Sequence, residues 1–335
     1  MLEKIPLSPK LSFPATSKCL GVIADAVVLL PVPAAAATTI ERPEVRSRFS
    51  NFTFILQSSR PGLWLTTVWF YLLPLGQRHV FTSGVFWLGL IYACFPLGLL
   101  LYGWNDYVDF EVDEANPRKG TFLFGARGSM DQLRKLPLII VLVQAPFVVA
   151  FCYLRGWHML LWFAGTVAIV AIYNWPRWGF KGRPPLEILN QAGYLFVFLL
   201  SSWLNLVPQL SWQAMAFGAL FAMHSHVFGE IMDLEPDRDA GRRTTAVVLG
   251  RVSAKMLIAA ILFVECALVF YFFHDATLGL FLLASGAWFL ADSLLFWRGK
   301  PYSPGQMRFA MIAWNVIALC SMPWVWWKAS LTLLR

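Results

Sequence analysis

Apolar runs of membrane-spanning length recur along this chain and constrain its fold more than any other feature. Of the 335 residues, 58% are hydrophobic and 14% are charged, so a soluble helical fold would have to bury nearly every run with little polar surface left over. A helix crosses a bilayer with about 20 mostly apolar residues. The sequence therefore predicts an all-α, polytopic membrane bundle with about nine transmembrane helices, at residues 62–76, 81–103, 136–154, 157–175, 188–207, 212–232, 255–273, 277–297 and 308–327.

Basic residues are distributed unevenly between the two sides of these spans. When the chain is threaded through nine spans, 23 of its 27 Lys and Arg residues fall on the same side as the N-terminus. Lys and Arg accumulate in cytoplasmic loops. We therefore expect a multi-pass protein of a bacterial cytoplasmic membrane, with its N-terminus on the cytoplasmic side and its C-terminus on the opposite side.

The first part of the chain differs from the rest. Residues 1–57 contain Pro, Ala and Ser, and their one apolar patch, at residues 22–30, is too short to span a bilayer. The acidic residues of this stretch fit a transit peptide poorly. We expect a mobile N-terminal extension over residues 1–57 and a transmembrane domain over residues 58–335.

The charge and the cysteines argue against other classes of protein. The net charge of +8 arises largely in short loops beside membrane spans, which favours contact with anionic lipid head groups over nucleic acid. The five cysteines are scattered, without the spacing of a zinc site or a disulfide framework. The sequence carries no signal of an oligomeric state.

Two acidic clusters stand at the ends of predicted spans. Residues three or four positions apart lie on one face of a helix, so the members of each cluster line up. The first cluster consists of Asn105, Asp106, Asp109 and Asp113, and the second of Asp233 and Asp237, followed by Gly241 and Thr244. They follow the second and the sixth span, at corresponding ends, which suggests a pseudo-duplicated arrangement.

A metal ion would explain why so many carboxylates stand together. Like charges four residues apart on a helix repel each other unless a cation lies between them. Oxygen ligands without a nearby Cys or His favour a hard divalent ion, and Mg²⁺ is the usual choice when phosphate oxygens complete its shell. The two clusters are therefore predicted to be half-sites that close on one Mg²⁺–diphosphate. The deep parts of the spans are nearly uncharged, apart from Glu265 and Asp292, for which the sequence shows no partner.

Basic residues accompany the acidic clusters. Arg118 and Lys119 follow the first cluster, Arg242 follows the second, and Lys181 lies in the loop after the fourth span. Cations of this kind bind the oxygens of a diphosphate leaving group and neutralise the charge that develops as its C–O bond breaks. For each of these residues a role as a topology signal is the alternative.

The motifs N-D-x-x-D-x-x-x-D and D-x-x-x-D-x-x-x-G-x-x-T together resemble the UbiA superfamily of intramembrane prenyltransferases, and both are matched in full. The segment Tyr173-Asn-Trp-Pro176, with Lys181, is similar to a third signature of that family, and Arg60-Pro61 is similar to its start. The resemblance covers about residues 58–327. Its three motifs stand in the right order and on one side of nine spans.

The resemblance implies a nine-helix bundle around a central cavity, and a prenyltransferase that uses Mg²⁺. Such an enzyme transfers a prenyl group from a polyprenyl diphosphate to a lipophilic acceptor within the membrane. The implied metal ligands, direct or through water, are Asn105, Asp106, Asp109, Asp113, Asp233 and Asp237. The implied catalytic residues are Asp106, Asp109, Asp233, Asp237, Lys181 and Tyr173. The diphosphate site would also contain Asn105 and Lys119, and charge and position add Arg118 and Arg242 to it.

The acceptor is less well determined. The segments 101–106 and 116–120, and the stretch from Met223 to the second motif, are similar to the family branch that includes lycopene elongases, which implies a carotenoid acceptor such as lycopene. Chlorophyll-type and aromatic or quinone-precursor acceptors stay open, because those branches share the metal motifs. A prenyl diphosphate cyclase or hydrolase also stays open, as does a lipid-binding or transport bundle without chemistry. His224 or His226 could accept a proton from the acceptor, but helix packing or lining of the cavity is the more common role for such a histidine.

Overall fold

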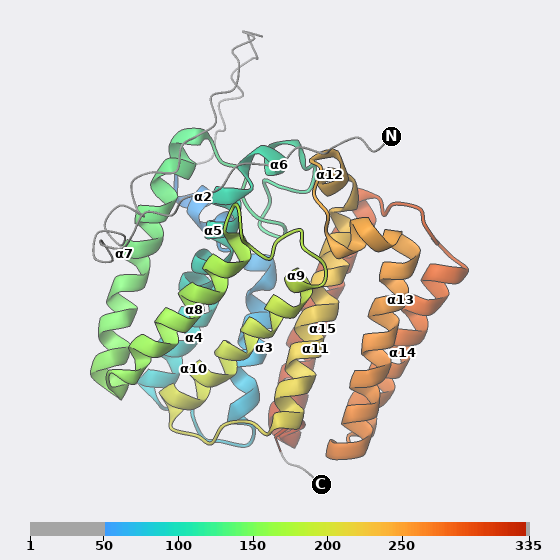
Figure 1. Ribbon diagram of the computed structural model, residues 1–335. Coiled ribbons are helices and arrows are strands. Elements are labelled where there is room, and N and C mark those ends of the chain that lie inside the picture. The colour runs from blue at the N-terminus through green and yellow to red at the C-terminus, as the bar shows by residue number, and fades with distance from the viewer. Residues whose placement is uncertain (1–50, 333–335) are drawn as a thin grey trace, which may run out of the picture. The chain divides into compact units, whose positions relative to one another are not determined.

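Helices lie at all nine predicted spans in the computed structural model, which describes residues 51–332 (Figure 1). Five spans are helices without an interruption: α7 (Met130–Arg155), α8 (His158–Asn174), α11 (Trp212–Met232), α14 (Ala276–Leu294) and α15 (Pro304–Lys328). Within the described residues the chain forms no β-strand, so the predicted all-α class is confirmed.

The other four spans are built from shorter helical pieces. The first combines η1 (Pro61–Leu63), α3 (Trp64–Leu72) and η2 (Leu73–Leu75), and the second combines α4 (Gly84–Gly98), η3 (Leu99–Gly103) and α5 (Trp104–Val108). The fifth combines α9 (Leu186–Leu189), η4 (Asn190–Tyr194) and α10 (Leu195–Asn205), and the seventh combines α13 (Thr245–Leu268) and η5 (Val269–Phe273). Three short helices lie outside the spans: α2 (Asn51–Ser58), α6 (Phe110–Ala115) and α12 (Leu234–Asp239).

Five helical segments are individually long and apolar enough to cross a membrane: Gly84–Val108, Met130–Arg155, Thr245–Phe273, Ala276–Leu294 and Pro304–Lys328. Large apolar side chains face outward on several helices. Tyr153 of α7, Tyr271 of η5 and Phe309 of α15, for example, are 89%, 75% and 74% exposed, which suits a lipid environment and would be costly in water. The chain is a multi-pass integral membrane protein.

The break in the second span has a local cause and leads to the first acidic cluster. Pro96 lies inside α4 and has no N–H to donate to the preceding turn. Shortly after it the helix widens into the π-turn η3, which leads directly into α5, the helix of Asn105 and Asp106. Such π-turns are frequent at functional sites.

The seventh span begins well before its predicted start at residue 255. α13 starts at Thr245 and is kinked at Gly250. The charged residues Arg251 and Lys255 lower the apolar content of this first part of the helix, so a count of apolar residues does not include it in the span. In the fold both charges have partners, because Arg251 contacts Glu235 and Lys255 lies 2.8 Å from Asp292.

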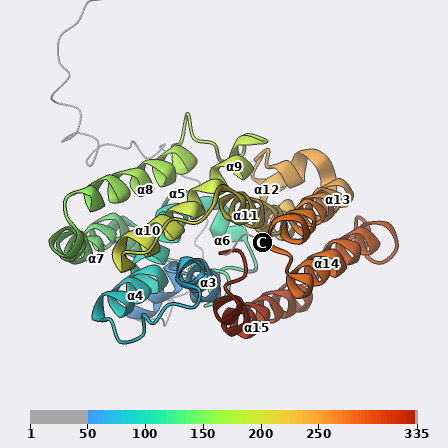
Figure 2. The ribbon, with the colours of Figure 1, turned by 90° about the horizontal axis from the view of Figure 1, so that it is seen from below.

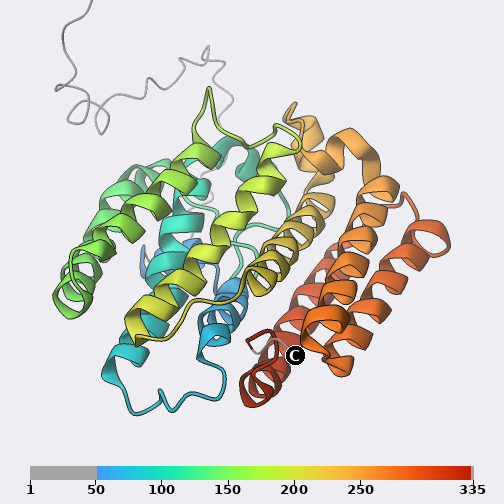
Figure 3. The ribbon, with the colours of Figure 1, turned by 60° about the horizontal axis from the view of Figure 1, so that its bottom comes forward.

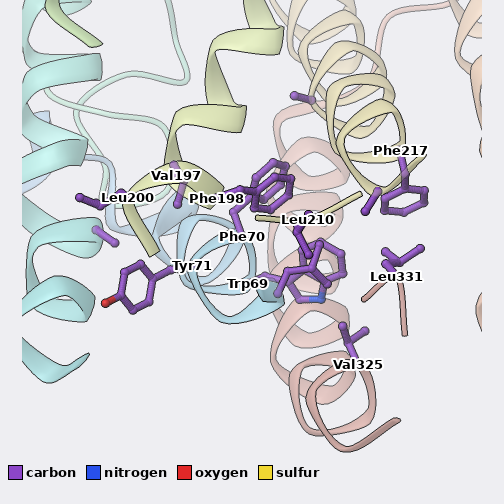
Figure 4. Packing of buried hydrophobic residues seen from close by; sticks show 14 of the residues in the cluster. Trp69, Phe70, Tyr71, Val197, Phe198, Leu200, Leu210, Phe217, Val325 and Leu331 are labelled. Carbon is purple, nitrogen blue, oxygen red and sulfur yellow. The ribbon is translucent and has the colours of Figure 1, made fainter. Parts of the chain in front are cut away.

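Aromatic contacts hold α3 between its neighbours. Figure 2 shows α3 beside α4 and α15, and α3 also contacts α10. Phe70 of α3 stacks on Phe198 of α10 with 4.8 Å between ring centroids, and Trp69 stacks on Phe221 of α11 at 5.6 Å. Figure 4 shows Trp69, Phe70 and Phe198 within this packing. On the other side of α11, α13 and α14 run side by side (Figure 3).

The predicted N-terminal extension, 1–57, lies mostly outside the described residues. Its last residues, from Asn51 onward, belong to α2. Phe54 of α2 is 3% exposed and packs in a small cluster with residues of η3 and α7. The domain boundary at residue 58 stays a prediction.

A buried ion pair joins α13 to α14. Lys255 and Asp292 are 0% and 1% exposed, and the ammonium group also donates to the carbonyl oxygen of Arg298 at 3.0 Å. The hydroxyl group of Tyr302 donates to the carboxylate of Asp292, and the centroid of its ring lies 4.6 Å from the ammonium group of Lys255. Among the described residues, the opposite charge that balances each of these groups is the other member of the pair.

Replacing Asp292 by Leu should lower the free energy of unfolding by about 3–5 kcal/mol, because it leaves a buried ammonium group without its partner. The double change Lys255→Met with Asp292→Leu should recover most of this loss, since no buried charge then remains. Denaturant unfolding in detergent measures both effects, and Asp239→Asn, at an exposed position, is the control. A double variant as unstable as the single one would contradict this account.

Candidate active site

Two short helices follow the ends of two long ones at the same end of the bundle, where α6 and α12 touch (Figure 1). The residue at each junction is an aspartate, Asp109 before α6 and Asp233 before α12. Their backbones agree closely, with φ −95° and ψ 7° at Asp109 and φ −99° and ψ 6° at Asp233. The next aspartate of each motif, Asp113 or Asp237, is the fourth residue of the short helix. The two motifs therefore share one local structure, as a pseudo-duplicated arrangement requires.

The first acidic cluster is buried, and lysine neutralises part of it. Asp106, Asp109 and Asp113 are 2%, 4% and 8% exposed. Lys119 donates from Nζ to Asp106 Oδ1 at 2.6 Å, and the same nitrogen lies 2.6 Å from Asp113 Oδ2. Asn105 donates to Asp109 at 3.0 Å. One ammonium group therefore bridges two of the three carboxylates.

The second cluster depends on a glycine turn. Gly241 has φ 70°, a left-handed conformation that strains any residue with a Cβ. Nothing lies within 4 Å of a Cβ added there, so the conformation and not the space requires glycine. The turn lets the backbone N–H of Arg242 donate to the carbonyl oxygen of Asp237 at 2.8 Å. The guanidinium group of Arg242 is thereby directed back toward the acids, 3.5 Å from the carboxylate of Asp237.

The two clusters are held together by crossed ion pairs. Arg118, which follows the first cluster, pairs with Asp233 of the second. Arg242, which follows the second cluster, pairs with Asp109 of the first. Both arginines stand nine residues after the junction aspartate of their own motif. Each half of the site therefore supplies the cation that the other half needs, as the predicted meeting of two half-sites demands.

The loop after α8 adds the third motif to the same place. Lys181 donates from Nζ to Asn105 Oδ1 at 2.6 Å and also pairs with Asp109. The loop folds back on the end of α8, because the backbone N–H of Lys181 donates to the carbonyl oxygen of Tyr173 at 3.2 Å. The ammonium group lies 5.6 Å from the ring centroid of Tyr173. All the site residues proposed from the sequence thus converge on one end of the bundle.

Arg60 belongs to the site although neither its spacing nor its neighbours in the sequence connect it with the acidic motifs. It donates to Asp106 at 3.1 Å, and its guanidinium carbon lies 4.8 Å over the ring of Tyr102. The chain can follow this path because Gly62 packs against Leu123, where an added Cβ would stand 2.7 Å from the carbonyl oxygen. The match of Arg60-Pro61 to the family pattern was the only available signal.

Asn116 is a second residue that sequence reasoning missed. Its side-chain amide donates to Asp233 Oδ1 at 2.7 Å, and its side-chain oxygen accepts the backbone N–H of Arg118 at 3.1 Å. Asn116 therefore contacts both members of one crossed ion pair, Arg118 and Asp233, and fixes their relative position. An Asn before a Pro is typical of a turn, so the sequence alone offered no reason to assign it a contact over such a distance.

Burial and mutual repulsion leave part of the acidic charge uncompensated. Burial, reinforced by neighbouring Asp106 and Asp109, raises the pKa of Asp113 to about 6. Burial, reinforced by Asp233, raises the pKa of Asp237 to about 7. Burial would also raise the pKa of Asp109, but Lys181 and Arg242 outweigh it and lower that pKa. The protein's own cations therefore do not neutralise the whole set.

These residues fit a magnesium ion by chemistry and by charge. Among residues 51–332, no three Asp, Glu, His or Cys side chains are arranged closely enough to enclose a metal, since lysine and arginine nitrogens stand between the carboxylates. Asp106 Oδ2 is buried and has no hydrogen-bond partner in the described part of the chain, which leaves it available to a further cation. The donors are oxygens, the ligands that Mg²⁺ prefers. The ligand set proposed from the sequence stays a prediction.

Known proteins resemble this chain in sequence and in fold. The sequence model of the UbiA prenyltransferase family matches residues 63–317. A lycopene elongase/hydratase from Corynebacterium glutamicum is 28% identical over 225 residues, which cover 64% of this chain and 76% of that protein. The lycopene elongase/hydratase from Halobacterium salinarum is 30% identical over 245 residues, covering 70% and 84%. The structure of a UbiA homolog from Archaeoglobus fulgidus bound to DMAPP and Mg²⁺ superposes with a TM-score of 0.63 at 17% identity, covering 81% of this chain and 98% of that one.

Lys181→Met should weaken binding of a prenyl diphosphate about tenfold to hundredfold, because a charge-assisted hydrogen bond contributes about 1.5–3 kcal/mol. The dissociation constant of a radiolabelled donor, measured on purified protein in detergent, gives the effect. Arg183→Met is the matched control, because Arg183 is an exposed cation of the same loop. Equal losses in the two variants would show that the loop contributes only general positive charge.

Proposed function

The chain belongs to the UbiA prenyltransferase family, and from this premise we propose that it transfers a prenyl group from a polyprenyl diphosphate to a lycopene-type carotenoid within the membrane. The observation that carries the proposal is the crossed site, in which two acidic motifs and the cations Arg118 and Arg242 meet at one end of an apolar bundle. A diphosphate needs such a polar end, and its prenyl tail needs the apolar interior beside it. The similarity to proteins described as lycopene elongase/hydratases supports the carotenoid acceptor.

The basic residues would bind the diphosphate. In the free protein Lys119, Lys181 and Arg242 contact carboxylates, and all three are partly or wholly shielded from water. A diphosphate anion would replace the carboxylates as the acceptor for these nitrogens. The entropic cost of ordering the side chains would be small, because the site already holds them close together. Arg60 and Arg118 would complete a ring of cations around the leaving group.

The acidic residues would hold the metal. Bound Mg²⁺ would neutralise charge on the diphosphate oxygens, a contribution that the lysines and arginines alone do not match. The residues proposed to hold it, directly or through water, are Asn105, Asp106, Asp109, Asp113, Asp233 and Asp237. Four of the six, Asp106, Asp109, Asp113 and Asp237, are less than a tenth exposed, and this burial would keep bulk water away from the reacting carbon and protect an allylic cation from hydrolysis.

The reaction would begin with heterolysis of the allylic C–O bond, whose electron pair leaves with the diphosphate. A double bond of the acceptor then donates its π electrons to the allylic carbon, and a new C–C bond forms. The acceptor is left with a cation next to the new bond, which loses a proton or takes up water. The side chain of Tyr173, beside Lys181, would lie at the start of the apolar interior where this cation forms.

A product assay in membranes that contain the chain tests the proposal. We expect radiolabelled dimethylallyl or geranylgeranyl diphosphate to label lycopene only in the presence of Mg²⁺, and EDTA to abolish the labelling. Asp109→Asn and Asp233→Asn should each reduce turnover about 100-fold, because each removes a carboxylate proposed to hold the Mg²⁺ that neutralises the leaving group. Glu111→Gln, an exposed acid in the same motif, is the control and should keep full activity.

The identity of the labelled product distinguishes the carotenoid transferase from the rival functions. A labelled chlorophyll-type or aromatic lipid, when those acceptors are offered in parallel, would replace the carotenoid assignment. Prenyl alcohol or a cyclised hydrocarbon alone would favour a hydrolase or cyclase. Lack of donor turnover in a well-folded preparation would favour a binding or transport protein.

We also propose that the active-site end faces the cytoplasm of a bacterial cell, as the bias of the basic residues suggests. A cysteine placed at exposed Arg177 should then react with a membrane-impermeant maleimide only after the membrane is opened. A cysteine at exposed Arg78 should react in intact spheroplasts. The opposite labelling pattern would reverse the orientation.

A further inference from the structure

Two histidines of α11 stand two residues apart and therefore point to opposite sides of the helix, because each residue turns an α-helix by about 100°. His224 and His226 differ in nearly every feature of their surroundings. Only one of them faces the candidate active site. The difference allows each to be assigned a separate role.

His224 is locked into the packing between helices. Its Nδ1 lies 3.0 Å from Oε1 of Glu265 on α13, and the two side chains are 6% and 0% exposed. Its ring packs edge-on against Phe221 and Trp314, with centroids 5.2 Å and 6.4 Å away. This pair ties α11 to α13, and it accounts for a buried acid that the sequence left without a partner.

His226 faces the other way, toward the third sequence motif. Its ring meets the ring of Tyr173 edge-on, with centroids 6.0 Å apart, and its side chain keeps 22% exposure. The ring centroid of Tyr173 in turn lies 5.6 Å from the ammonium group of Lys181. A continuous row of contacts thus leads from Asp109, through Lys181 and Tyr173, to the imidazole of His226.

Glu230 stands behind the imidazole and is itself held in place. Its Oε1 lies 3.2 Å from Nε2 of His226, while its Oε2 accepts the backbone N–H of Ala246 at 3.0 Å. The side chain is 5% exposed. Neither Oε1 nor Nε2 has a hydrogen bond in the described part of the chain, although both are buried. A small rotation of the imidazole would form that bond.

The position of His226 along α11 suits a base that acts beside the diphosphate. His226 precedes Asp233 by seven residues, close to two turns, so both lie on one side of the helix. The rise of an α-helix places the imidazole about 10 Å deeper in the span than the junction aspartate. The reacting carbon of a prenyl diphosphate bound at the acidic motifs would lie on this apolar side of the phosphates.

We propose that His226, oriented by Glu230, is the catalytic base that removes a proton from the acceptor after the new C–C bond has formed. This assignment rests on the proposed prenyl transfer. Glu230 is a positioning residue, because it acts through the imidazole.

The step balances without a further reagent. The C–H bond next to the acceptor cation breaks, and its electron pair forms the C=C bond of the product. With its hydrogen on Nε2, facing Glu230, the neutral imidazole accepts the proton at Nδ1. The carboxylate of Glu230 stabilises the imidazolium that results, and the proton leaves with water after the product has departed. Without the base, water attacks the cation and an alcohol forms.

The test compares His226→Gln with His224→Gln in purified, full-length protein supplied with Mg²⁺, labelled donor and lycopene. Diphosphate release and the ratio of alkene to alcohol product are measured separately. We expect His226→Gln to lower the alkene-to-alcohol ratio about 100-fold, in the range of general base catalysis, and to slow diphosphate release less than about threefold. His224→Gln should leave the ratio unchanged, whatever it does to stability.

Two further variants keep the test decisive. Glu230→Gln should lower the same ratio by about tenfold, and it tests the pair even if His226→Gln does not fold. Added imidazole should restore alkene formation in His226→Ala and have no effect on His224→Ala. A purely structural role of His226 would not respond to imidazole.

The outcomes separate this inference from the proposed function. If the wild-type protein forms no new C–C bond, the proposed transfer fails, and the assignment of the base fails with it. If the wild-type protein prenylates lycopene and the ratio is the same in the wild type, His226→Gln and Glu230→Gln, the transfer stands and the base is overturned. A fall in the ratio for His224→Gln equal to that for His226→Gln would also overturn it.

Discussion

Carboxylates buried where water is scarce are the constraint on which the rest of this structure depends. Three aspartates of the first motif are less than a tenth exposed. Charge in such a place is costly unless a partner compensates for it. Each junction aspartate pairs with an arginine that follows the opposite motif, Asp233 with Arg118 and Asp109 with Arg242. Neither half of the site is balanced alone, so the ends of the second and sixth spans have to meet.

The same rule governs polar groups elsewhere in the bundle. Lys255 lies against Asp292, and His224 lies against Glu265, each pair joining α13 to another helix. Within a bilayer an ionisable residue is tolerated when it is paired and faces protein. These pairs therefore fix which helices are neighbours, while the aromatic stacks of α3 fill the space between them.

The site has a polar end and an apolar side, and the contacts connect the two. Lys181 touches the first acidic motif and also lies over the ring of Tyr173. Tyr173 then meets His226, deeper in the span. A reaction that separates charge at one point and forms a C–C bond beside it requires this change of environment over a short distance. The crossed ion pairs hold the polar end, and α8 and α11 together hold the apolar side.

The sequence by itself determined the membrane-spanning class, the nine spans and the two acidic motifs. These features are local, because a bilayer demands a certain length of apolar chain and a helix brings residues three or four apart onto one face. Only the tertiary structure decided the partners: Arg60 for Asp106, Asn116 for Asp233 and His224 for Glu265, which are 46, 117 and 41 residues apart. It also decided that His226 and not His224 faces the site. The reason is physical, since pairing across the bundle depends on how whole helices pack, and no spacing along the chain records that.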